Sequence, residues 1–463
     1  MVLRLSAVLI GLLCTASTFA ADTEGTSFQA VFFRNQMNAS AYLLDVVNNG
    51  ASDVTVNATY FEWNGNALSS TPTVNTETVK AGSYVRINFI GKNVVYNTIG
   101  PGLNSYPDLR VQITSSGPVS VFATNVDFTN LSGIKSHTVG DSYMVLPDSM
   151  AGREYVINLP DALQTYSQTD LWQMKVLFFI PVSDSVKITF TQIMKSRLFQ
   201  TSQFTLEKKQ GQDQRYFAQM TGLGDSVFKI TGDGDFLVVA GVTCASDMKG
   251  DCDFAAYMPP PMVSTDCSAC SVLDDHITYY DGDLYMLSAP KTCTTSVAYN
   301  VSADSDPTDL MTFDNNEYYP PQSPGKDSAN SFWYSSNQAL LQMSRIGYRG
   351  KENGGLYLDL VPALSQYVKG QTTFYVMSKS TLKIIMDGDA NGKLTIDGAV
   401  APNGQISMKG WYILTTTVES GVHKVNAGGL YTVEVQTNTQ GYSHGFIPAY
   451  NKQKTDAVNV CSA

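Results

Sequence analysis

The chain has 463 residues and a formal net charge of −11 at pH 7, with 43% hydrophobic and 15% charged residues. A chain of this length exceeds a single hydrophobic core, so two or three domains are expected. Its Lys and Arg residues form no cluster of the kind that binds nucleic acid or an anionic membrane, which excludes those partners. Abundant Tyr, Phe, Thr, Ser and Val with little charge is the composition of half-buried β-sheets.

The N-terminus carries the features of a secretory signal peptide. Arg4 gives a small positive region, residues 5–14 are apolar, and Thr18, Phe19 and Ala20 offer a small-residue cleavage site. The apolar run is too short to span a bilayer. No later stretch is apolar enough for a membrane helix, and no hydrophobic C-terminal tail indicates a lipid anchor. We therefore expect residues 1–20 to be a signal peptide and the protein to be secreted and extracellular.

A repeated segment indicates the organisation of the next 240 residues. Residues 109–125 read LRVQITSSGPVSVFATN and residues 226–242 read SVFKITGDGDFLVVAGV. Both copies suggest two strands joined by a tight turn of Ser, Gly, Asp and Pro, and both lead into an apolar run that ends in proline, at 141–147 and 253–261. Self-similarity of this kind predicts repeated β modules, one over residues 21–150 and its repeat over 151–262.

A third β module is expected over residues 263–463. It carries a polar stretch near 294–335, rich in Asp, Asn, Ser, Pro and Tyr, which we interpret as a loop insertion. Residues 338–346 suggest either a helix or a buried strand, and 421–437 again suggest strand, glycine turn and strand. The predicted fold class is all-β, with tandem antiparallel β-sandwich-like modules. The alternative is β-propeller-like closure, although the modules exceed a blade of about 40–50 residues.

Six cysteines remain once Cys14 is removed with the signal peptide. An even number in a secreted chain predicts disulfides, with Cys244–Cys252 favoured because that bond would close a short loop. A metal-binding or redox role for the Cys267-Ser-Ala-Cys270 motif lacks the strand–helix context it needs. The disulfide candidates are Cys244, Cys252, Cys267, Cys270, Cys293 and Cys461.

Four Asn-X-Ser/Thr sequons predict glycans on exposed positions of a secreted chain. If Asn57 carries a glycan, its face of the predicted strand must point to water. The sequons begin at Asn38, Asn57, Asn130 and Asn300.

Residues 387–392, DGDANG, resemble the start of a calcium loop, with oxygen ligands at Asp387, Asp389 and Asn391. The closing bidentate Glu is missing, since Gly398 stands in its place, and the flanks suggest strands. A hairpin with an Asn-Gly turn explains the same residues, so the calcium site is the weaker of two interpretations.

Catalytic signals are close to absent. Residues 441–445, GYSHG, match a nucleophile-elbow pattern, but no His follows His444 and Pro448 interrupts the helix this motif requires. The four histidines lie far apart, without metal-ligand spacing. His423, in a predicted strand, is expected to be a hydrogen-bonded structural residue. We predict that the protein is not an enzyme and holds no cofactor.

Seven short motifs, in order along the chain, resemble the N-terminal domain family of IgG Fc-binding protein, a secreted, mucus-associated type. The motifs lie at 25–35 (GTSFQAVFFRN), 113–125, 143–155 (YMVLP and GREY), 252–260 (CD to PP), 359–367 (DLVPALSQY), 394–398 (LTIDG) and 421–423 (GVH). The polar stretch near 294–335 has no counterpart in the family pattern. The resemblance implies extracellular adhesion or binding, with glycoproteins or a mucus-like matrix as partners, and does not map any immunoglobulin contact.

The expected function is therefore that of a secreted, non-enzymatic adhesion protein. A lectin-like or carbohydrate-acting β protein is one alternative, and a structural extracellular component that associates with itself is another. Exposed aromatic residues bring large contact area at low entropy cost. The predicted binding surface is Tyr318, Tyr319, Trp333 and Tyr334, although these aromatics are as well explained by covering a core edge.

Overall fold

The protein is described by a computed structural model of the whole chain. It describes residues 21–452, except 35–40, 98, 127–139, 161–172, 195–196, 212, 221–225, 247–251, 263–273, 280–283, 289–295, 304–308, 315–318, 323–330, 337–339, 348–355, 408 and 440–441. These residues form sheets that are antiparallel except for one short parallel pair, Phe32–Phe33 with Val95–Tyr96, and two short 3-10 helices, η1 (Asp148–Met150) and η2 (Leu364–Gln366). The predicted all-β fold of sandwich-like modules is confirmed.

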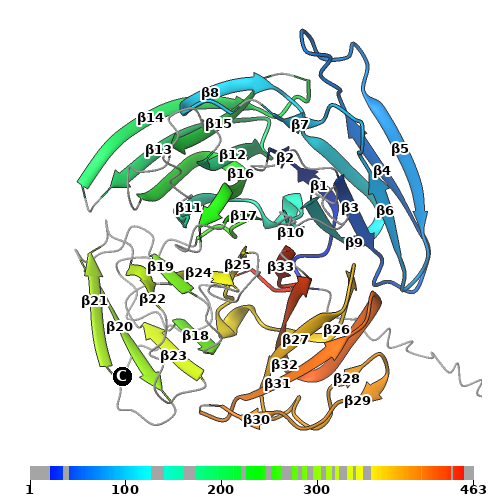
Figure 1. Cartoon of the computed structure of the whole chain (residues 1–463), viewed down its shortest axis with the longest axis vertical. Coiled ribbons are helices and arrows are strands. Elements are labelled where there is room, and N and C mark those ends of the chain that lie inside the picture. The colour runs from blue at the N-terminus through cyan, green and yellow to red at the C-terminus, as the bar shows by residue number, and fades with distance from the viewer. Residues whose placement is uncertain are drawn as a thin grey trace, which may run out of the picture.

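The described strands fall into four units arranged around a common centre (Figure 1). Unit 1 contains β1 (Gly25–Ala30), β2 (Phe32–Phe33), β3 (Ala41–Val47), β4 (Val54–Tyr60), β5 (Thr73–Val79), β6 (Tyr84–Asn88), β7 (Val95–Tyr96), β9 (Val111–Val126) and β10 (Gly140–Val145), whereas β8 (Gly102–Pro107), which lies between β7 and β9 along the chain, joins the sheet of unit 2. Unit 2 contains β11 (Gly152–Asn158), β12 (Met174–Pro181), β13 (Ser185–Met194), β14 (Arg197–Glu207), β15 (Asp213–Met220), β16 (Ser226–Ser246) and β17 (Cys252–Tyr257).

The C-terminal part of the chain, expected to form one module, is divided between two units. Unit 3 contains β18 (Asp274–Tyr279), β19 (Leu284–Ser288), β20 (Ser296–Ala303), β21 (Asp309–Asp314), β22 (Tyr319–Gln322), β23 (Ser331–Ser336), β24 (Gln342–Gly347) and β25 (Tyr357–Leu360). Unit 4 contains β26 (Val368–Val376), β27 (Ser380–Met386), β28 (Thr395–Ile396), β29 (Ala399–Val400), β30 (Gln405–Ile406), β31 (Tyr412–Val418), β32 (Gly421–Thr439) and β33 (Tyr442–Phe446).

Units 1, 2 and 4 are each organised by one long strand. The first half of β9 pairs with β1 and β4, and its second half pairs with β3 and β10. The first half of β16 pairs with β11 and β13, and its second half with β12 and β17. The first half of β32 pairs with β26 and β28, and its second half pairs with β27 and β33. Each long strand therefore joins two layers of its unit.

The expected tight turn within each repeated segment is wrong, because the chain continues as one strand through the Gly-containing stretch. Glycine is still required where the long strand passes from its first set of partner strands to its second. A Cβ on Gly232 would lie 2.8 Å from the ring of Phe236, so the close approach of the chain to itself requires glycine here. The stretch allows the strand to pass from one layer to the next without reversing.

Unit 3 follows the same plan with the long strand divided in two. β23 pairs with β18 and β20, whereas β24 pairs with β19 and β25. The polar stretch near 294–335, expected to be a loop, supplies β20, β21, β22 and β23 to this unit. Of the two interpretations of residues 338–346, the strand is observed in β24. The polar composition of this stretch suggested a loop. Strands form there nevertheless, because only the inward-facing side chains of a two-layer unit need to be apolar.

The last strand of every unit lies near the centre of the molecule (Figure 1). β10 contacts β17 and β33, and β25 also contacts β17 and β33. Each of these four strands is followed, two residues after its end, by a proline: Pro147, Pro259, Pro362 and Pro448. The apolar runs ending in proline are thus the central strands.

The two ends of the described chain close the ring. The Thr23 N–H donates to the Tyr450 carbonyl oxygen at 3.3 Å, and the Tyr450 N–H donates to Thr23 Oγ1 at 3.2 Å. The Lys452 N–H donates to Asp22 Oδ2 at 2.9 Å. On another face, Tyr84 of unit 1 stacks on Tyr375 of unit 4 with ring centroids 3.9 Å apart. Hydrogen bonds and aromatic packing therefore hold unit 4 against unit 1.

Candidate binding pocket and buried polar centre

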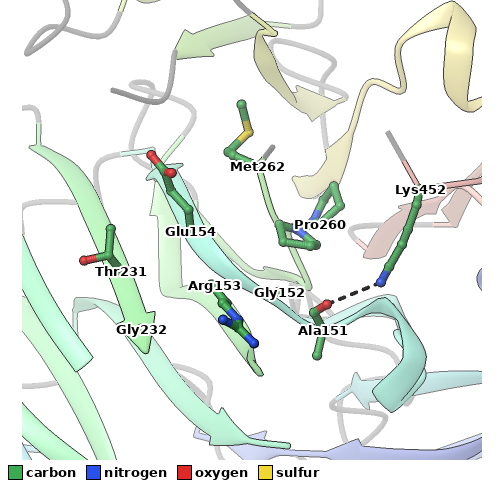
Figure 2. A pocket seen from close by; sticks show the side chains of 10 residues that line it. Ala151, Gly152, Arg153, Glu154, Thr231, Gly232, Pro260, Met262 and Lys452 are labelled. Carbon is green, nitrogen blue, oxygen red and sulfur yellow. Dashed lines mark hydrogen bonds between the residues drawn. The ribbon is translucent and has the colours of Figure 1, made fainter. Parts of the chain in front are cut away.

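A surface pocket of about 430 Å³ lies where unit 2 begins and ends (Figure 2). A volume of this size suits a small-molecule or glycan-sized group. Its walls come from the start of β11, the partner change of β16, the proline stretch after β17 and the last described residue of the chain. It is lined by Ala151, Gly152, Arg153, Glu154, Thr231, Gly232, Pro260, Pro261, Met262 and Lys452.

A close packing of glycine and proline forms the pocket floor. A Cβ on Gly152 would lie 2.3 Å from Pro261 Cβ, so only glycine fits against the proline. The Met262 N–H donates to the Glu154 carbonyl oxygen at 2.8 Å and fixes the proline stretch along β11. The register of β11 against β16 shifts between Gly152 and Glu154, which leaves an irregular strand end at the pocket.

Two cationic side chains, those of Arg153 and Lys452, and one carboxylate, that of Glu154, border the pocket. The Arg153 guanidinium pairs with Asp235 at 3.0 Å, and both side chains are largely exposed. Lys452 Nζ donates to the Ala151 carbonyl oxygen at 3.4 Å (Figure 2). Because these cations lie beside an apolar floor of proline and methionine, the pocket can accept a ligand with an anionic group and an apolar face.

The second notable region is the buried polar centre, where Asp141 of β10 and Asp253 of β17 lie. The Ala256 and Leu358 N–H groups donate to Asp141 Oδ2 at 3.1 and 3.3 Å. The Gly140 and Leu356 N–H groups donate to Asp253 at 2.6 and 3.1 Å. Burial raises the pKa of both carboxyls well above the usual value, and the backbone donors lower it in part.

A further ionic cluster joins units 3 and 4 beside this centre. Arg345 of β24 pairs with Asp359 at 3.2 Å and also with Glu434 of β32. The Tyr357 hydroxyl donates to Glu434 at 3.3 Å, and the Arg345 guanidinium lies over the Tyr357 ring. Burial raises the pKa of Asp359 to about 7, although Arg345 opposes the shift. Every one of these groups is buried, so the cluster ties strands together rather than facing a ligand.

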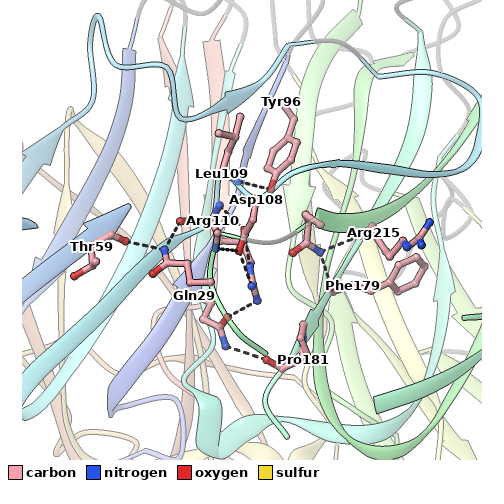
Figure 3. Close-up of polar contacts among 12 residues, drawn as sticks. Gln29, Thr59, Tyr96, Asp108, Leu109, Arg110, Phe179, Pro181 and Arg215 are labelled. Carbon is pink, nitrogen blue, oxygen red and sulfur yellow. Dashed lines mark hydrogen bonds and ion pairs between the residues drawn. The ribbon is translucent and has the colours of Figure 1, made fainter. Parts of the chain in front are cut away.

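Units 1 and 2 are joined by a third buried network (Figure 3). Arg110 forms a two-point ion pair with Asp108, at 2.8 and 2.7 Å, and donates to Gln29 Oε1 at 2.9 Å. Gln29 Nε2 in turn donates to the Pro181 carbonyl oxygen at 3.4 Å. From unit 2, Gln210 Nε2 donates to the Thr59 and Arg110 carbonyl oxygens at 3.2 and 3.1 Å. All of these contacts are structural.

The DGDANG segment forms a hydrogen-bonded loop rather than a two-strand hairpin. Asp387 Oδ1 accepts from the Ala390 N–H and Oδ2 accepts from the Leu430 N–H, both at 2.9 Å. Asn391 Oδ1 accepts from the Gly404 N–H at 2.8 Å, and Asp389 is exposed. β27 before the loop pairs with β31 and β32, not with β28 after it, so the hairpin interpretation is wrong.

Calcium binding at Asp387, Asp389 and Asn391 stays a prediction. Among the described residues no group of three or more His, Cys, Asp or Glu is placed to hold a metal ion. His423 is hydrogen-bonded as expected: its Nδ1 lies 2.8 Å from Asp397 and its Nε2 lies 2.7 Å from the Glu419 carbonyl oxygen.

The cysteine and glycosylation predictions are only partly within the described residues. Cys244 is buried and disulfide-bonded, but the side chains of the other five candidates lie outside the described part, so the pairing stays a prediction. Asn57 alternates with buried Val56 and Ala58 on β4 and therefore faces outward, as a glycan there requires. Asn38 and Asn130 lie outside the described residues, and only the backbone of Asn300 is described.

The predicted aromatic binding surface needs correction. Trp333 and Tyr334 are each only 5% exposed. The Trp333 indole donates to Asp275 at 2.8 Å, and Lys409 Nζ lies 4.3 Å from the centre of its ring. These two aromatics cover a core, the alternative that the sequence left open. Tyr318 lies outside the described residues, and only the backbone of Tyr319 is described.

Sequence reasoning missed both the pocket and the buried acids. Asp141 and Asp253 stand at the same place in the two proline-ended runs, six residues before Pro147 and Pro259. This repeated Asp was the available signal for a shared structural role. The pocket gave no such signal, because its walls come from four separate segments. Comparisons of the chain with protein-family models and with curated protein sequences find no match.

Proposed function

We propose that this chain is a secreted, non-enzymatic binding protein that attaches to extracellular glycoproteins or a mucus-like matrix. The observation that carries the proposal is the pocket at the start of unit 2, with Arg153 and Lys452 beside a proline and methionine floor. Its lining residues bring one carboxylate and one hydroxyl, and no imidazole or thiol. That donor set suits recognition better than acid–base or nucleophilic catalysis.

The proposed ligand chemistry is an acidic group on a glycoprotein, such as a carboxylated or sulfated sugar. The two cations supply charge-assisted hydrogen bonds, which are stronger than neutral ones. The apolar floor accepts the less polar face of a sugar ring or a short side chain. The predicted signal peptide, the sequons and the resemblance to the mucus-associated family support an extracellular setting for this ligand. None of the described helices is long and apolar enough to cross a membrane.

The test measures binding of the secreted, glycosylated protein to immobilised acidic mucin by biolayer interferometry. The double variant Arg153→Ala with Lys452→Ala should bind at least about tenfold more weakly, because each charged contact contributes about 1.5–3 kcal/mol. Lys80→Ala is the matched control, since Lys80 is an exposed cation paired with Asp53 on unit 1. Equal binding by the double variant and the control would contradict the proposal.

A second arm uses mucin from which sialic acid and sulfate have been removed. Loss of binding assigns the acidic group to the glycan and favours the lectin-like form of the function. Retained binding that still depends on Arg153 and Lys452 assigns the acidic group to the partner's polypeptide.

A further inference from the structure

Two tyrosines from distant parts of the chain stack on each other where unit 1 meets unit 4. Tyr84 is the first residue of β6, and Tyr375 lies near the end of β26. Their ring centroids are 3.9 Å apart, and their ring planes differ by 20°. The two side chains therefore lie nearly parallel and in van der Waals contact, although they belong to different sheets.

The hydroxyl groups of this pair lie at the same end of the stack. Interaction with the Tyr375 hydroxyl, followed by burial, raises the pKa of Tyr84 to about 12, and this interaction requires the two hydroxyls to be near each other. Because the rings are also nearly parallel, the ring carbons next to one hydroxyl lie over those next to the other. These ortho carbons share the unpaired electron of a tyrosyl radical, so they are the atoms that bond when two such radicals couple.

Neighbouring contacts hold the pair in place and leave it accessible. The Arg86 guanidinium lies 5.1 Å from the centre of the Tyr375 ring. It is itself fixed by two contacts to the Asp45 carboxylate, at 2.7 and 2.8 Å. Both tyrosines are partly exposed to solvent, so a small oxidant can reach them without unfolding of the chain.

A second tyrosine pair lacks this geometry. Tyr96 of β7 and Tyr106 of β8 meet edge to face, with ring centroids 5.5 Å apart. Tyr96 is fully buried, and its hydroxyl accepts a hydrogen bond from the Leu109 N–H at 2.8 Å. This pair offers neither the parallel rings nor the access to solvent, and it serves as an internal comparison.

We propose that Tyr84 and Tyr375 are a site of dityrosine formation, at which a peroxidase with hydrogen peroxide joins unit 1 to unit 4 by a carbon–carbon bond. Each phenol loses one electron to the oxidant and its hydroxyl proton to water, which gives two tyrosyl radicals. The radicals couple between their ortho carbons, and the hydrogen on each of these carbons then moves as a proton to the oxygen of its ring. One molecule of hydrogen peroxide takes up the two electrons and two protons and becomes two molecules of water.

The bond would close the ring of units covalently. A cross-link between residues this distant in sequence restricts the unfolded chain and so stabilises the folded one. The inference goes beyond the proposed binding function, because neither tyrosine lines the pocket. Failure of the cross-link would leave the pocket proposal intact, and failure of the pocket would leave the cross-link intact.

The test treats the secreted, glycosylated protein at about 1 µM with a peroxidase and hydrogen peroxide, since low concentration favours coupling within one chain over coupling between copies. The monomer is isolated by size-exclusion chromatography, digested and analysed by mass spectrometry. The peptides that contain Tyr84 and Tyr375 should be found joined, and lighter by two hydrogen atoms than the sum of the free peptides. The oxidised monomer should also show dityrosine fluorescence and a higher melting temperature than the untreated protein.

Three variants separate this site from general oxidation. Tyr84→Phe and Tyr375→Phe should each abolish the joined peptide and the rise in melting temperature, because phenylalanine keeps the ring but has no hydroxyl to oxidise. Tyr106→Phe is the matched control and should leave both intact. Circular dichroism and the melting temperature before oxidation check that all three variants keep the fold. A monomer whose dityrosine joins other tyrosines, or dityrosine found only between copies, would overturn the proposal.

Discussion

The Asp141 carboxyl is hydrogen-bonded to the strand that carries Asp253, and the Asp253 carboxyl is hydrogen-bonded to the strand that carries Asp141. The N–H of Ala256, three residues after Asp253, donates to Asp141 at 3.1 Å, and the N–H of Gly140, immediately before Asp141, donates to Asp253 at 2.6 Å. Both carboxyls also accept from unit 3, through Leu358 and Leu356. The two side chains thus fasten three units at the centre of the ring.

Removing one of these carboxyls should cost much of the stability of the fold. Asp141→Ala leaves the Ala256, Leu358 and Ser142 N–H groups without their acceptor. We expect the free energy of unfolding to fall by about 3 kcal/mol or more, since each buried unsatisfied group costs about 1–3 kcal/mol. Urea denaturation measures the change.

Asp141→Asn is the informative companion, because it keeps one acceptor oxygen and mimics a protonated carboxyl. It should be less destabilised than Asp141→Ala. Asp53→Ala, at an exposed aspartate, should behave like the wild type. Equal stability of Asp141→Ala and the wild type would show that the central carboxyl is not a fastening point.

Stability should fall as the pH rises from 5 to 8. Burial raises the pKa of Asp359 from 3.8 to about 7, so between these values the folded state keeps a proton that the unfolded state has released. One such group lowers the free energy of unfolding by about 1.4 kcal/mol per pH unit over that window. The raised pKa values of Asp141, Asp253 and Glu434 act in the same direction.

His444 opposes this trend in part of the range. Burial lowers its pKa to about 3, so its contribution increases stability as pH rises toward 6.5 and is constant above that. Urea denaturation between pH 5 and 8 should therefore show the steepest fall near and above pH 6.5. Asp359→Asn should reduce the slope up to about pH 7, where the contribution of Asp359 ends. A slope for Asp359→Asn identical to that of the wild type would contradict the raised pKa of Asp359.

The Tyr357 ring lies between two glycines of neighbouring strands. A Cβ on Gly445 of β33 would lie 2.2 Å from the ring, and one on Gly347 of β24 would lie 1.9 Å from it. Gly445→Ala should therefore lower the free energy of unfolding by about 2–3 kcal/mol through overpacking. Gly428→Ala is the matched control, because nothing lies within 4 Å of its Cβ position.

A double-mutant cycle with Tyr357→Ala identifies the cause. Removing the ring removes the overlap, so the double variant should be less destabilised than the sum of the two single variants. Strict additivity would mean that the ring is not the group that excludes a side chain at Gly445.

The Asp387 loop gives a test that separates a structural loop from a calcium site. Asp387→Ala frees the Ala390 and Leu430 N–H groups and should lower the melting temperature equally with calcium and with EDTA. Asp389→Ala, at an exposed position, should change nothing without calcium. A rise in the wild-type melting temperature on adding calcium, abolished by Asp389→Ala, would establish the metal site instead.

The β-rich fold and the repeats could be predicted from local patterns. Alternation of buried and exposed residues is visible in β4 and β13, because side chains on a strand alternate between faces. The number of units could not be predicted, since unit 3 divides its long strand and fills a polar stretch with strands. The continuation of one strand through each repeated segment could not be predicted either. A Ser-Gly-Pro stretch can reverse a chain or only bend it, and the surrounding sheets decide which.

The sequence by itself determined the all-β class, the repeated segments and the proline-ended runs, because these depend on contacts between neighbours along the chain. Only the tertiary structure decided that those runs meet at one centre, that Trp333 and Tyr334 are buried, and that Ala151, Met262 and Lys452 border one pocket. These are relations between residues distant in sequence. Long-range pairing, the burial of charge and the shape of a pocket depend on which strands share a sheet, which no local pattern records.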